Sequence, residues 1–500
     1  MMGRKRAVRA LAATALAALV ANAVSAQDLG PVVTQQYTNG GVYEGTMKNG
    51  KPHGQGRYTL PNGYEYDGTW ADGERTGTGT TKFVDGSIYE GEVENGLPQG
   101  TGQVALLDGS VIIGTWVEGA LSGEATATYA DGSVYMGTFE NNQRHGTGTW
   151  TRPDGYVYDG GWDAGKRSGS ATITFPDGAR YEGEMRSDKR NGTGKLTMPD
   201  GFTYDGAWID DQMNGFGRVT YVNGDVYEGV LVQGQRSGNG KMTYANSDIY
   251  EGAFVADERN GTGTFIGTDG YRYEGEWVAG THHGQGRLTY PDGSVYEGQF
   301  DNNLPHGAGR VTYANGDVYE GDWLEGEING QGASRYASGV VYEGSFQAGV
   351  PQGQGTLTGP DGYRYSGGWD AGVRDGAGEV TYPDGSRYSG TFRNDQFHGP
   401  GRWESADGVI YDGVWQDGAI TGEGRVTYAS GDVYEGALVD GKREGQGTLT
   451  YASGEVLTGL WRNGVMIDGE TLPAPEPAPE AAADTAPDAA PNSAPATDSQ

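Results

Sequence analysis

Residues 273–295 read YEGEWVAGTHHGQGRLTYPDGSV, a unit of 23 residues that opens with Tyr273 and carries Gly275 two positions later. Nineteen such units follow one another without insertion or deletion, the first starting at Tyr43 and the last at Leu457. If the opening residue is position zero, that position is Tyr in seventeen units and position two is Gly in all. A fixed period of this size is typical of a repeat array, in which each unit contacts mainly its neighbours. The pattern therefore argues against an ordinary enzyme with a central pocket.

Two stretches of each unit alternate with a period of two, which predicts two β-strands per unit and no helix. The first covers positions zero, two and four with an aromatic residue, Gly and a large apolar residue, and the second covers positions thirteen, fifteen and seventeen. The first stretch is represented by Tyr66, Gly68, Trp70, Tyr204, Gly206, Trp208, Tyr273, Gly275 and Trp277. We expect rings from adjacent strands to lie across the backbone at the glycines, so that the core is aromatic rings over Gly.

Two turns are expected to join the strands. One contains Asn-Gly or Asp-Gly at positions nineteen and twenty, such as Asn62-Gly63. This pair favours a tight hairpin turn in which both central residues have positive φ. The other is expected from about position six to eleven, with Gly, Asn or Asp at seven and Gly at eleven. These residue types adopt left-handed backbone at low cost.

The whole pattern over residues 41–469 resembles the MORN (membrane occupation and recognition nexus) repeat. The residues that carry the resemblance are Tyr-Glu-Gly-x-Trp, Gly-x-x-His-Gly-x-Gly, and Asp-Gly before the next Tyr. The departures are Ile112 for Tyr, Ala125 and Ala171 for Gly, Ser247 for Gly, and Asp468 for Gly in the last unit. The resemblance implies an all-β fold, an elongated single-layer twisted antiparallel sheet of consecutive β-hairpins. It also implies an organising or interaction role.

Both ends of the chain differ from the array. Residues 1–26 have a charged start, a short apolar stretch and the small-residue site Val24-Ser25-Ala26, a pattern that predicts a cleaved signal peptide and export to the periplasm or beyond. The rival interpretation is an uncleaved anchor, for which the apolar stretch is short. Residues 27–40 are expected to form a cap or linker. Residues 470–500 are expected to be a disordered, acidic tail rich in Pro and Ala.

The formal net charge of −32 disfavours nucleic acid and anionic membranes, which would repel the chain at long range. Lys and Arg nevertheless gather at positions eight and nine, where stacked hairpins would align them on one rim. Two interpretations stand, solvated turn charge or a stripe that binds an anionic surface. The residues of this rim are Lys51, Arg75, Arg144, Lys166, Arg167, Lys189, Arg190, Arg236, Arg259, Arg374, Lys442 and Arg443.

We expect no catalytic, cofactor-binding or metal-binding residues. Five of the six His residues occupy position ten, where other units carry Thr, Gln or Ser, and units roughly 10 Å apart do not bring two ligands to one zinc. Turn chemistry explains the Asp-Gly pairs without calcium. The Gly-x-Gly of each unit does not lie between a strand and a helix, as a dinucleotide site requires.

The leading hypothesis is a non-enzymatic, exported scaffold for an unidentified protein partner or for self-assembly. End-to-end dimers would form through unpaired sheet edges, expected near Val32-Val33-Thr34 and residues 457–461. One alternative is peripheral binding of anionic lipid or lipopolysaccharide through the basic rim. Another is a phosphatidylinositol phosphate kinase label, because plant enzymes of that class carry similar repeats. We expect no kinase domain in this chain, so such a label would be carried by the repeats alone.

Overall fold

A computed structural model describes residues 30–472 of the chain. Those residues form β-strands joined by short loops, and no helix occurs among them. No helix able to span a membrane is therefore found in this part of the chain. The predicted signal peptide and most of the predicted tail lie outside the described residues.

The strands belong to two compact units that divide within β20 (Ile249–Val255). The strands of the first unit are β1 (Val33–Gln36), β2 (Val42–Lys48), β3 (Lys51–Thr59), β4 (Glu65–Ala71), β5 (Glu74–Lys82), β6 (Ile88–Glu94), β7 (Leu97–Ala105), β8 (Val111–Val117), β9 (Ala120–Thr128), β10 (Val134–Glu140), β11 (Gln143–Thr151), β12 (Val157–Asp163), β13 (Lys166–Thr174), β14 (Arg180–Arg186), β15 (Lys189–Thr197), β16 (Thr203–Ile209), β17 (Gln212–Thr220), β18 (Val226–Val232) and β19 (Gln235–Thr243).

The strands of the second unit are β21 (Glu258–Ile266), β22 (Arg272–Val278), β23 (Thr281–Thr289), β24 (Val295–Asp301), β25 (Leu304–Thr312), β26 (Val318–Leu324), β27 (Glu327–Arg335), β28 (Val341–Gln347), β29 (Val350–Thr358), β30 (Arg364–Asp370), β31 (Val373–Thr381), β32 (Arg387–Arg393), β33 (Gln396–Glu404), β34 (Ile410–Gln416), β35 (Ala419–Thr427), β36 (Val433–Val439), β37 (Lys442–Thr450), β38 (Val456–Arg462) and β39 (Val465–Leu472).

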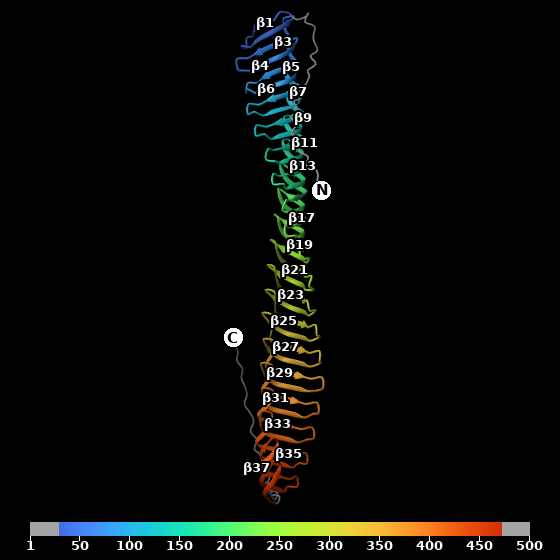
Figure 1. The fold of residues 1–500 in the computed structure, drawn as a ribbon, viewed down its shortest axis with the longest axis vertical. Helices are drawn as coiled ribbons and strands as arrows, with labels where there is room; N and C mark the ends of the chain where they lie inside the picture. Colours follow the sequence, from blue (N-terminus) through green and yellow to red (C-terminus); the bar gives the residue numbers. More distant parts are fainter. Residues whose placement is uncertain (1–29, 473–500) are drawn as a thin grey trace, which may run out of the picture. The chain divides into compact units, whose positions relative to one another are not determined.

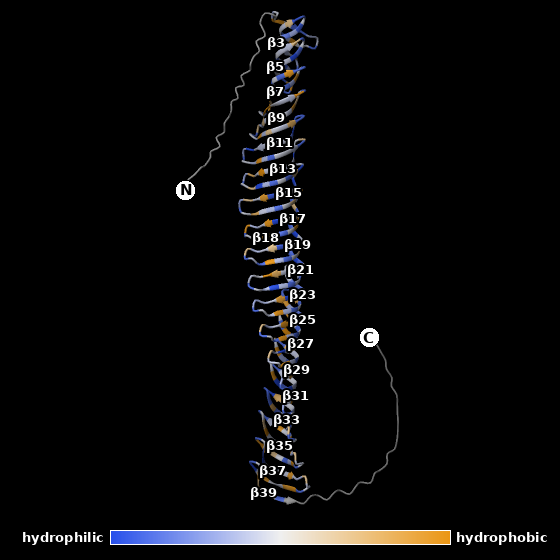
Figure 2. Ribbon diagram, turned by 90° about the vertical axis from the view of Figure 1, so that its right-hand side faces the viewer, coloured by the Kyte–Doolittle hydropathy of each residue, from blue (hydrophilic) through white to orange (hydrophobic). Residues whose placement is uncertain are grey.

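Within each unit, every strand pairs in antiparallel fashion with the strands before and after it in the chain (Figure 1). Extensive contacts join sequence neighbours alone among the described strands, so each unit is an open sheet of a single layer. Figure 2 shows hydrophobic and hydrophilic stretches side by side within the hairpins of both units. The predicted all-β fold of consecutive antiparallel hairpins is confirmed.

The loop between the two strands of a repeat is shorter than predicted. It consists of positions six and seven alone, and both residues are left-handed, as at Asn49 (φ 56°) and Gly50 (φ 75°). This is the geometry of a two-residue type I′ turn, whose twist matches that of the flanking strands. The predicted turn over positions six to eleven is therefore wrong, because the second strand already begins at position eight.

The Gly at position eleven lies in a β-bulge of the second strand. In β5, Gly77 has φ 71°, and the pairing shifts between Gly68 and Trp70 of β4. Three residues of β5, positions ten to twelve, face Thr69 alone as a result. Left-handed backbone at this position is thus used to bend a strand, not to close a turn.

The loop at positions seventeen to twenty-one also differs from the prediction. Gly63 is left-handed (φ 92°), but Asn62 is not among the residues with positive φ. Instead, the Asn62 Oδ1 accepts a hydrogen bond of 3.1 Å from the Tyr64 N–H. The Leu60 N–H closes the loop with a bond of 2.8 Å to the Tyr64 carbonyl. The Asn or Asp at position nineteen therefore acts through an Asx-type side-chain contact.

In the core, the Tyr at position zero lies across two glycines. The Gly at position thirteen is covered by a ring from the adjacent strand, as predicted, whereas the Gly at position two is covered by the Tyr of its own strand. A Cβ on Gly206 would lie 2.6 Å from the Tyr204 hydroxyl and 2.5 Å from the Cα of Gly217 on the adjacent strand. The Tyr204 hydroxyl donates a hydrogen bond of 2.6 Å to the Ala207 carbonyl, and Tyr204 is fully buried. Aromatic rings at position four link successive repeats, because the Trp208 Nε1 donates a 2.9 Å bond to the carbonyl of Gly194 in the preceding repeat.

The two edge strands among the described residues are β1 and β39. The strand β1 pairs only with β2, close to the N-terminal edge that the sequence predicts. The C-terminal prediction is wrong, because β38 at residues 456–462 is covered by β39. The residues that depart from the repeat pattern near Asp468 form this last strand, so the edge lies one strand further on.

Candidate functional site

Each sheet has a core face and an open face. In β6, Tyr89 and Val93 are buried, whereas Glu90, Glu92 and Glu94 between and beyond them are exposed. The open face is therefore made by positions one, three and five of the first strand and by the residues that lie opposite them. Because the aromatic core is closed on the other face, these side chains are free to serve binding.

Charged side chains form a ladder along the open face. The register places position fourteen opposite position one of its own repeat and of the next, as Arg218 faces both Asp205 and Glu228. The Arg218 Nη1 lies 3.1 Å from the Glu228 Oε1. Similar contacts join Arg287 to Glu297 at 3.0 Å and Arg402 to Asp412 at 3.1 Å. Exposed pairs of this kind contribute little to stability.

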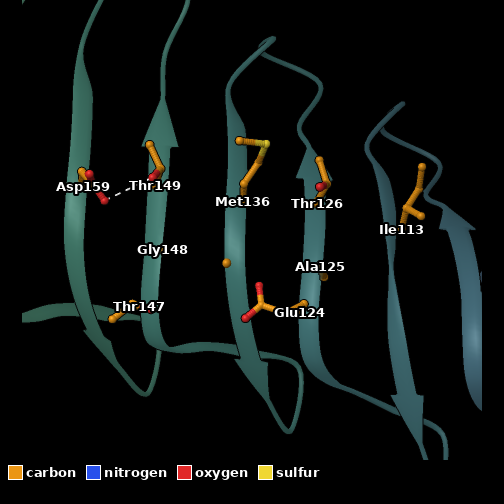
Figure 3. A pocket seen from close by; sticks show the side chains of 10 residues that line it. Ile113, Glu124, Ala125, Thr126, Met136, Thr147, Gly148, Thr149 and Asp159 are labelled. Carbon is orange, nitrogen blue, oxygen red and sulfur yellow. Dashed lines mark hydrogen bonds between the residues drawn. The ribbon is translucent and has the colours of Figure 1, made fainter. Parts of the chain in front are cut away.

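Two exposed apolar residues interrupt the ladder on β8 and β10. Ile113 and Met136 occupy position one, where most repeats carry Asp or Glu, and they are 50% and 55% exposed. Thr126 of β9 lies directly between them, since it pairs with both. Figure 3 shows the three side chains in a row across adjacent strands. They line an open depression of about 480 Å³ that reaches Thr149 and Asp159.

Acidic residues surround this apolar row. Residues 88–163 are all described by the structure, and the open face that they form from β6 to β12 carries no Lys or Arg. Its acidic residues are Glu90, Glu92, Glu94, Glu124, Glu140, Asp159 and Asp163. The sequence contains the signal, an apolar residue in a position that is usually acidic. The pairing register of the strands is needed to place that position on the open face.

The predicted basic rim separates into two groups. The lysines at position eight are exposed: Lys51, Lys166, Lys189 and Lys442. The arginines at position nine lie on the core face, half-buried against aromatic rings: Arg75, Arg144, Arg167, Arg190, Arg236, Arg259, Arg374 and Arg443. Both groups belong to the second strand, not to a turn. Binding of an anionic surface stays a prediction that depends on the four lysines.

The arginines at position nine are held by the next repeat. The Arg190 guanidinium lies 4.1 Å from the ring centre of Trp208, a cation–π distance. In four repeats the arginine also contacts an Asp at position seven of the following repeat, with Nε to carboxylate distances of 2.8 to 3.1 Å. These contacts join repeats to one another, which is a structural role.

The histidines do not converge. His145 lies 3.6 Å from Asp163 and 3.4 Å from Glu140. Among the residues that the structure describes, no group of three or more His, Cys, Asp or Glu could hold a metal ion. His282 is different, because it occupies position nine and stacks on Tyr273 with ring centres 3.7 Å apart. Burial, and secondarily the charge of Arg259, lowers the pKa of His282 to about 4.

Comparison with protein families gives one match. The MORN repeat model matches residues 43–63, 66–88, 89–110, 113–134, 135–155, 158–180, 181–203, 204–226, 227–249, 250–270, 273–295, 296–318, 319–341, 342–362, 365–387, 388–410, 411–433 and 434–456. No curated protein matches the chain.

Several solved structures show weak likeness to the chain. The TCP domain of SAS-4 from Drosophila melanogaster, in complex with a proline-rich motif of Ana2, is 17% identical, with 34% of this chain and 86% of that chain covered and a TM-score of 0.21. The TCP10 domain of CPAP from Danio rerio, in complex with a STIL peptide, is 15% identical over 58% of this chain and 97% of that chain, with a TM-score of 0.14. A streptogramin B lyase is 15% identical over 60% and 92%, with a TM-score of 0.11. TM-scores this low carry no argument about function.

Proposed function

Because this chain belongs to the MORN-repeat family, we propose that it is a non-enzymatic, exported scaffold that binds a protein partner through the open face of its repeats. The observation that carries this proposal is the difference between the two faces of the sheet: one packs the core and the other is left exposed. Tyr and Trp rings close the core face, and the open face carries side chains that the core does not need. A single-layer sheet of this kind presents a long, regular surface.

The non-enzymatic part of the proposal is supported by how the described residues are used. Repeat strands, their loops and the additional strand β1 account for residues 30–472, and this part of the chain holds no kinase domain. The polar groups of the repeats recur in phase and do not gather at one place. The export part is supported by the pattern of residues 1–26, outside the described residues.

Self-assembly is a second candidate, favoured by the edge strands. In the described residues β1 and β39 each have one hydrogen-bonded neighbour, which leaves a row of backbone groups on the other side. Such edges accept strand addition unless they are covered. Sedimentation of the mature chain, and of variants that lack residues 27–40 or 463–472, would test this. A monomer at all concentrations would contradict it.

Site-specific photo-crosslinking in the producing cell would test the scaffold proposal. A photoreactive residue is placed at Thr149 or Glu297 on the open face, and at Asn223 or Asn315 in the exposed loops between repeats as controls. We expect discrete crosslinked protein products from the open-face positions and none from the controls. Products of equal yield at all four positions, or none from the open face, would contradict the proposal. Cell fractionation of the same tagged chain checks export.

A further inference from the structure

We infer that the open face of β6 to β12 binds a cationic, amphipathic protein segment, with Ile113 and Met136 as the apolar contact. This inference deepens the proposed function, since it assigns a partner chemistry to one part of the open face. It depends on three features of that surface: an exposed apolar row, the absence of Lys and Arg from the described open face of β6 to β12, and the depression between the strands.

The apolar row is a local departure from the repeat. On neighbouring strands the same positions carry Glu90 and Asp159, both exposed to solvent. Replacement of an exposed acid by Ile113 or Met136 adds nothing to the core, because both side chains remain half exposed. Val117, 45% exposed on the same face of β8, extends the apolar surface. Exposed apolar groups with a polar border are typical of interaction sites.

The charge around the row selects the partner. Elsewhere on the open face, most acids at position one have a cation opposite them, as Glu228 has Arg218. From β6 to β12 the register instead places Gln103 opposite Glu90, Thr138 opposite Glu124 and Thr149 opposite Asp159. The acids nearest the apolar row therefore have no Lys or Arg of the described strands opposite them, whereas Asp163 at the border faces Lys166. Such a surface attracts cations and repels anions over a distance of about a Debye length.

The same charge argues against other occupants. A second copy of this chain carries the same net charge of −32 and the same acidic border, so face-to-face pairing here would be repelled. Anionic lipid would be repelled as well. A segment with Lys or Arg flanking Leu-type side chains complements both the acidic border and the apolar row. Its cations would meet Glu124 and Asp159, and its apolar residues would cover Ile113 and Met136. Met side chains are well suited to such contacts because they adapt in shape.

The test uses the mature chain and a fluorescent peptide of fourteen Lys and Leu residues arranged as an amphipathic segment. Two comparison peptides replace Leu by Ser or Lys by Glu. We expect binding of the Lys/Leu peptide, with at least about tenfold weaker binding of either comparison peptide. The double variant I113E/M136E restores the acid that other repeats carry at these positions, so it is expected to fold. It should weaken binding of the Lys/Leu peptide by about tenfold even though it adds negative charge.

A charge variant separates this site from the rest of the face. E124K/D159K should also weaken binding about tenfold, whereas E320K/E343K, on the open face of the second unit, should not. Equal binding by I113E/M136E and the unmodified chain, or equal binding of the Lys/Ser peptide, would overturn the inference. Crosslinked partners that persist at Glu297 when I113E/M136E is introduced would leave the scaffold proposal standing while this inference fails. The absence of crosslinks at every open-face position of the chain without these substitutions would contradict the scaffold proposal itself.

Discussion

Arg190 and Asp211, 21 residues apart in the sequence, are joined by four hydrogen bonds between successive repeats, one of them a 3.0 Å bond from the Asp211 N–H to the Arg190 carbonyl. The Arg190 backbone N–H and Nε each donate a 3.0 Å hydrogen bond to the Asp211 Oδ1, and Nη2 donates one of 3.1 Å to the Asp211 carbonyl. Asp211 is the second residue of a type I′ loop, with φ 71°. The type I′ loop of one repeat is thus hydrogen-bonded to the second strand of the repeat before it.

Substitution of Asp211 is expected to loosen this connection. In Asp211→Gly the left-handed backbone is retained without strain, so the change isolates the two hydrogen bonds to the carboxylate. We expect a loss of about 1 kcal/mol in local stability, measured by hydrogen exchange of β15 to β17. A cycle with Arg190→Leu gives the coupling energy, expected at about 0.5 to 1.5 kcal/mol. A coupling energy of zero would show that the two residues act independently.

Gly206→Val should disrupt the core at a single repeat. The added Cβ would lie 2.8 Å from the Phe216 carbonyl as well as against the Tyr204 hydroxyl, so the ring must leave its place over the backbone. Hydrogen exchange should rise first in β16 and β17, because repeats are coupled mainly to their neighbours. Gly165→Asn is the matched control, since no atom lies within 4 Å of a Cβ there and Asn142 occupies the equivalent position. Uniform loss of protection across all repeats would contradict local coupling.

The sequence predicts the repeat, the two strands and the ring over Gly because each depends on residues that recur in phase. One departure agrees with this packing, since Ile112 removes the ring in the repeat where Ala125 replaces Gly, whereas Ala171 replaces Gly in a repeat that keeps Tyr158. Loop geometry is harder to predict. Left-handed residues at position six include Ala164 (φ 45°) and Glu118 (φ 49°), whose residue types do not signal positive φ. The predicted turn therefore begins at the correct position but extends too far, to position eleven instead of seven.

The open-face site is not visible from composition alone. Its identification requires the register that sets Thr126 between Ile113 and Met136 on adjacent strands. The arginines show the same limit. Arg190 has the sequence features of a solvated charge, but the strand places it over Trp208. The two-residue turn, which the sequence does not predict, places position nine opposite position four and so on the core face.

Ser247→Gly is expected to stabilise the chain. Ser247 stands where other repeats have Gly at position twenty, and it adopts φ 73°. Left-handed backbone costs a residue with a side chain about 1 kcal/mol, a cost that Gly does not bear. The variant should therefore raise the local free energy of unfolding by about that amount, read from hydrogen exchange at β19 to β21. A decrease in protection would mean that the Ser247 side chain contributes more than its backbone strain costs.

The four exposed lysines allow a clean test of lipid binding. Arginines of the rim are unsuitable for this purpose, because Arg167 and Arg190 hold neighbouring repeats together and their loss would disturb the fold. We expect no binding of the mature chain to anionic vesicles at low salt, where electrostatic attraction is strongest. The measurement is co-sedimentation, with Lys51, Lys166, Lys189 and Lys442 changed to Glu in a second protein. Binding by the first protein and its loss in the second would instead support the lipid alternative.

His282 should make the stability of its repeat depend on pH. Its pKa falls from the usual 6.5 to about 4 because the ring is buried, with Arg259 adding to the effect, and its Nδ1 is buried without a hydrogen-bond partner. The neutral ring is therefore favoured in the folded state. Its stabilising contribution is full above pH 6.5 and is lost as the pH falls toward 4, by about 1.4 kcal/mol per pH unit within that window.

The control for this prediction is His282→Phe, because Phe397 already fills the same position and stacks on Tyr388 with ring centres 3.8 Å apart. Hydrogen exchange of β22 to β24 at pH 7, 6, 5 and 4 would be compared in the two proteins. We expect similar protection at pH 7 and a growing difference below pH 6.5, with the Phe variant the more stable. All other ionisable groups are common to the two proteins, so the difference between them reports His282 alone. Parallel pH profiles would show that His282 remains uncharged or finds a proton acceptor without loss of packing.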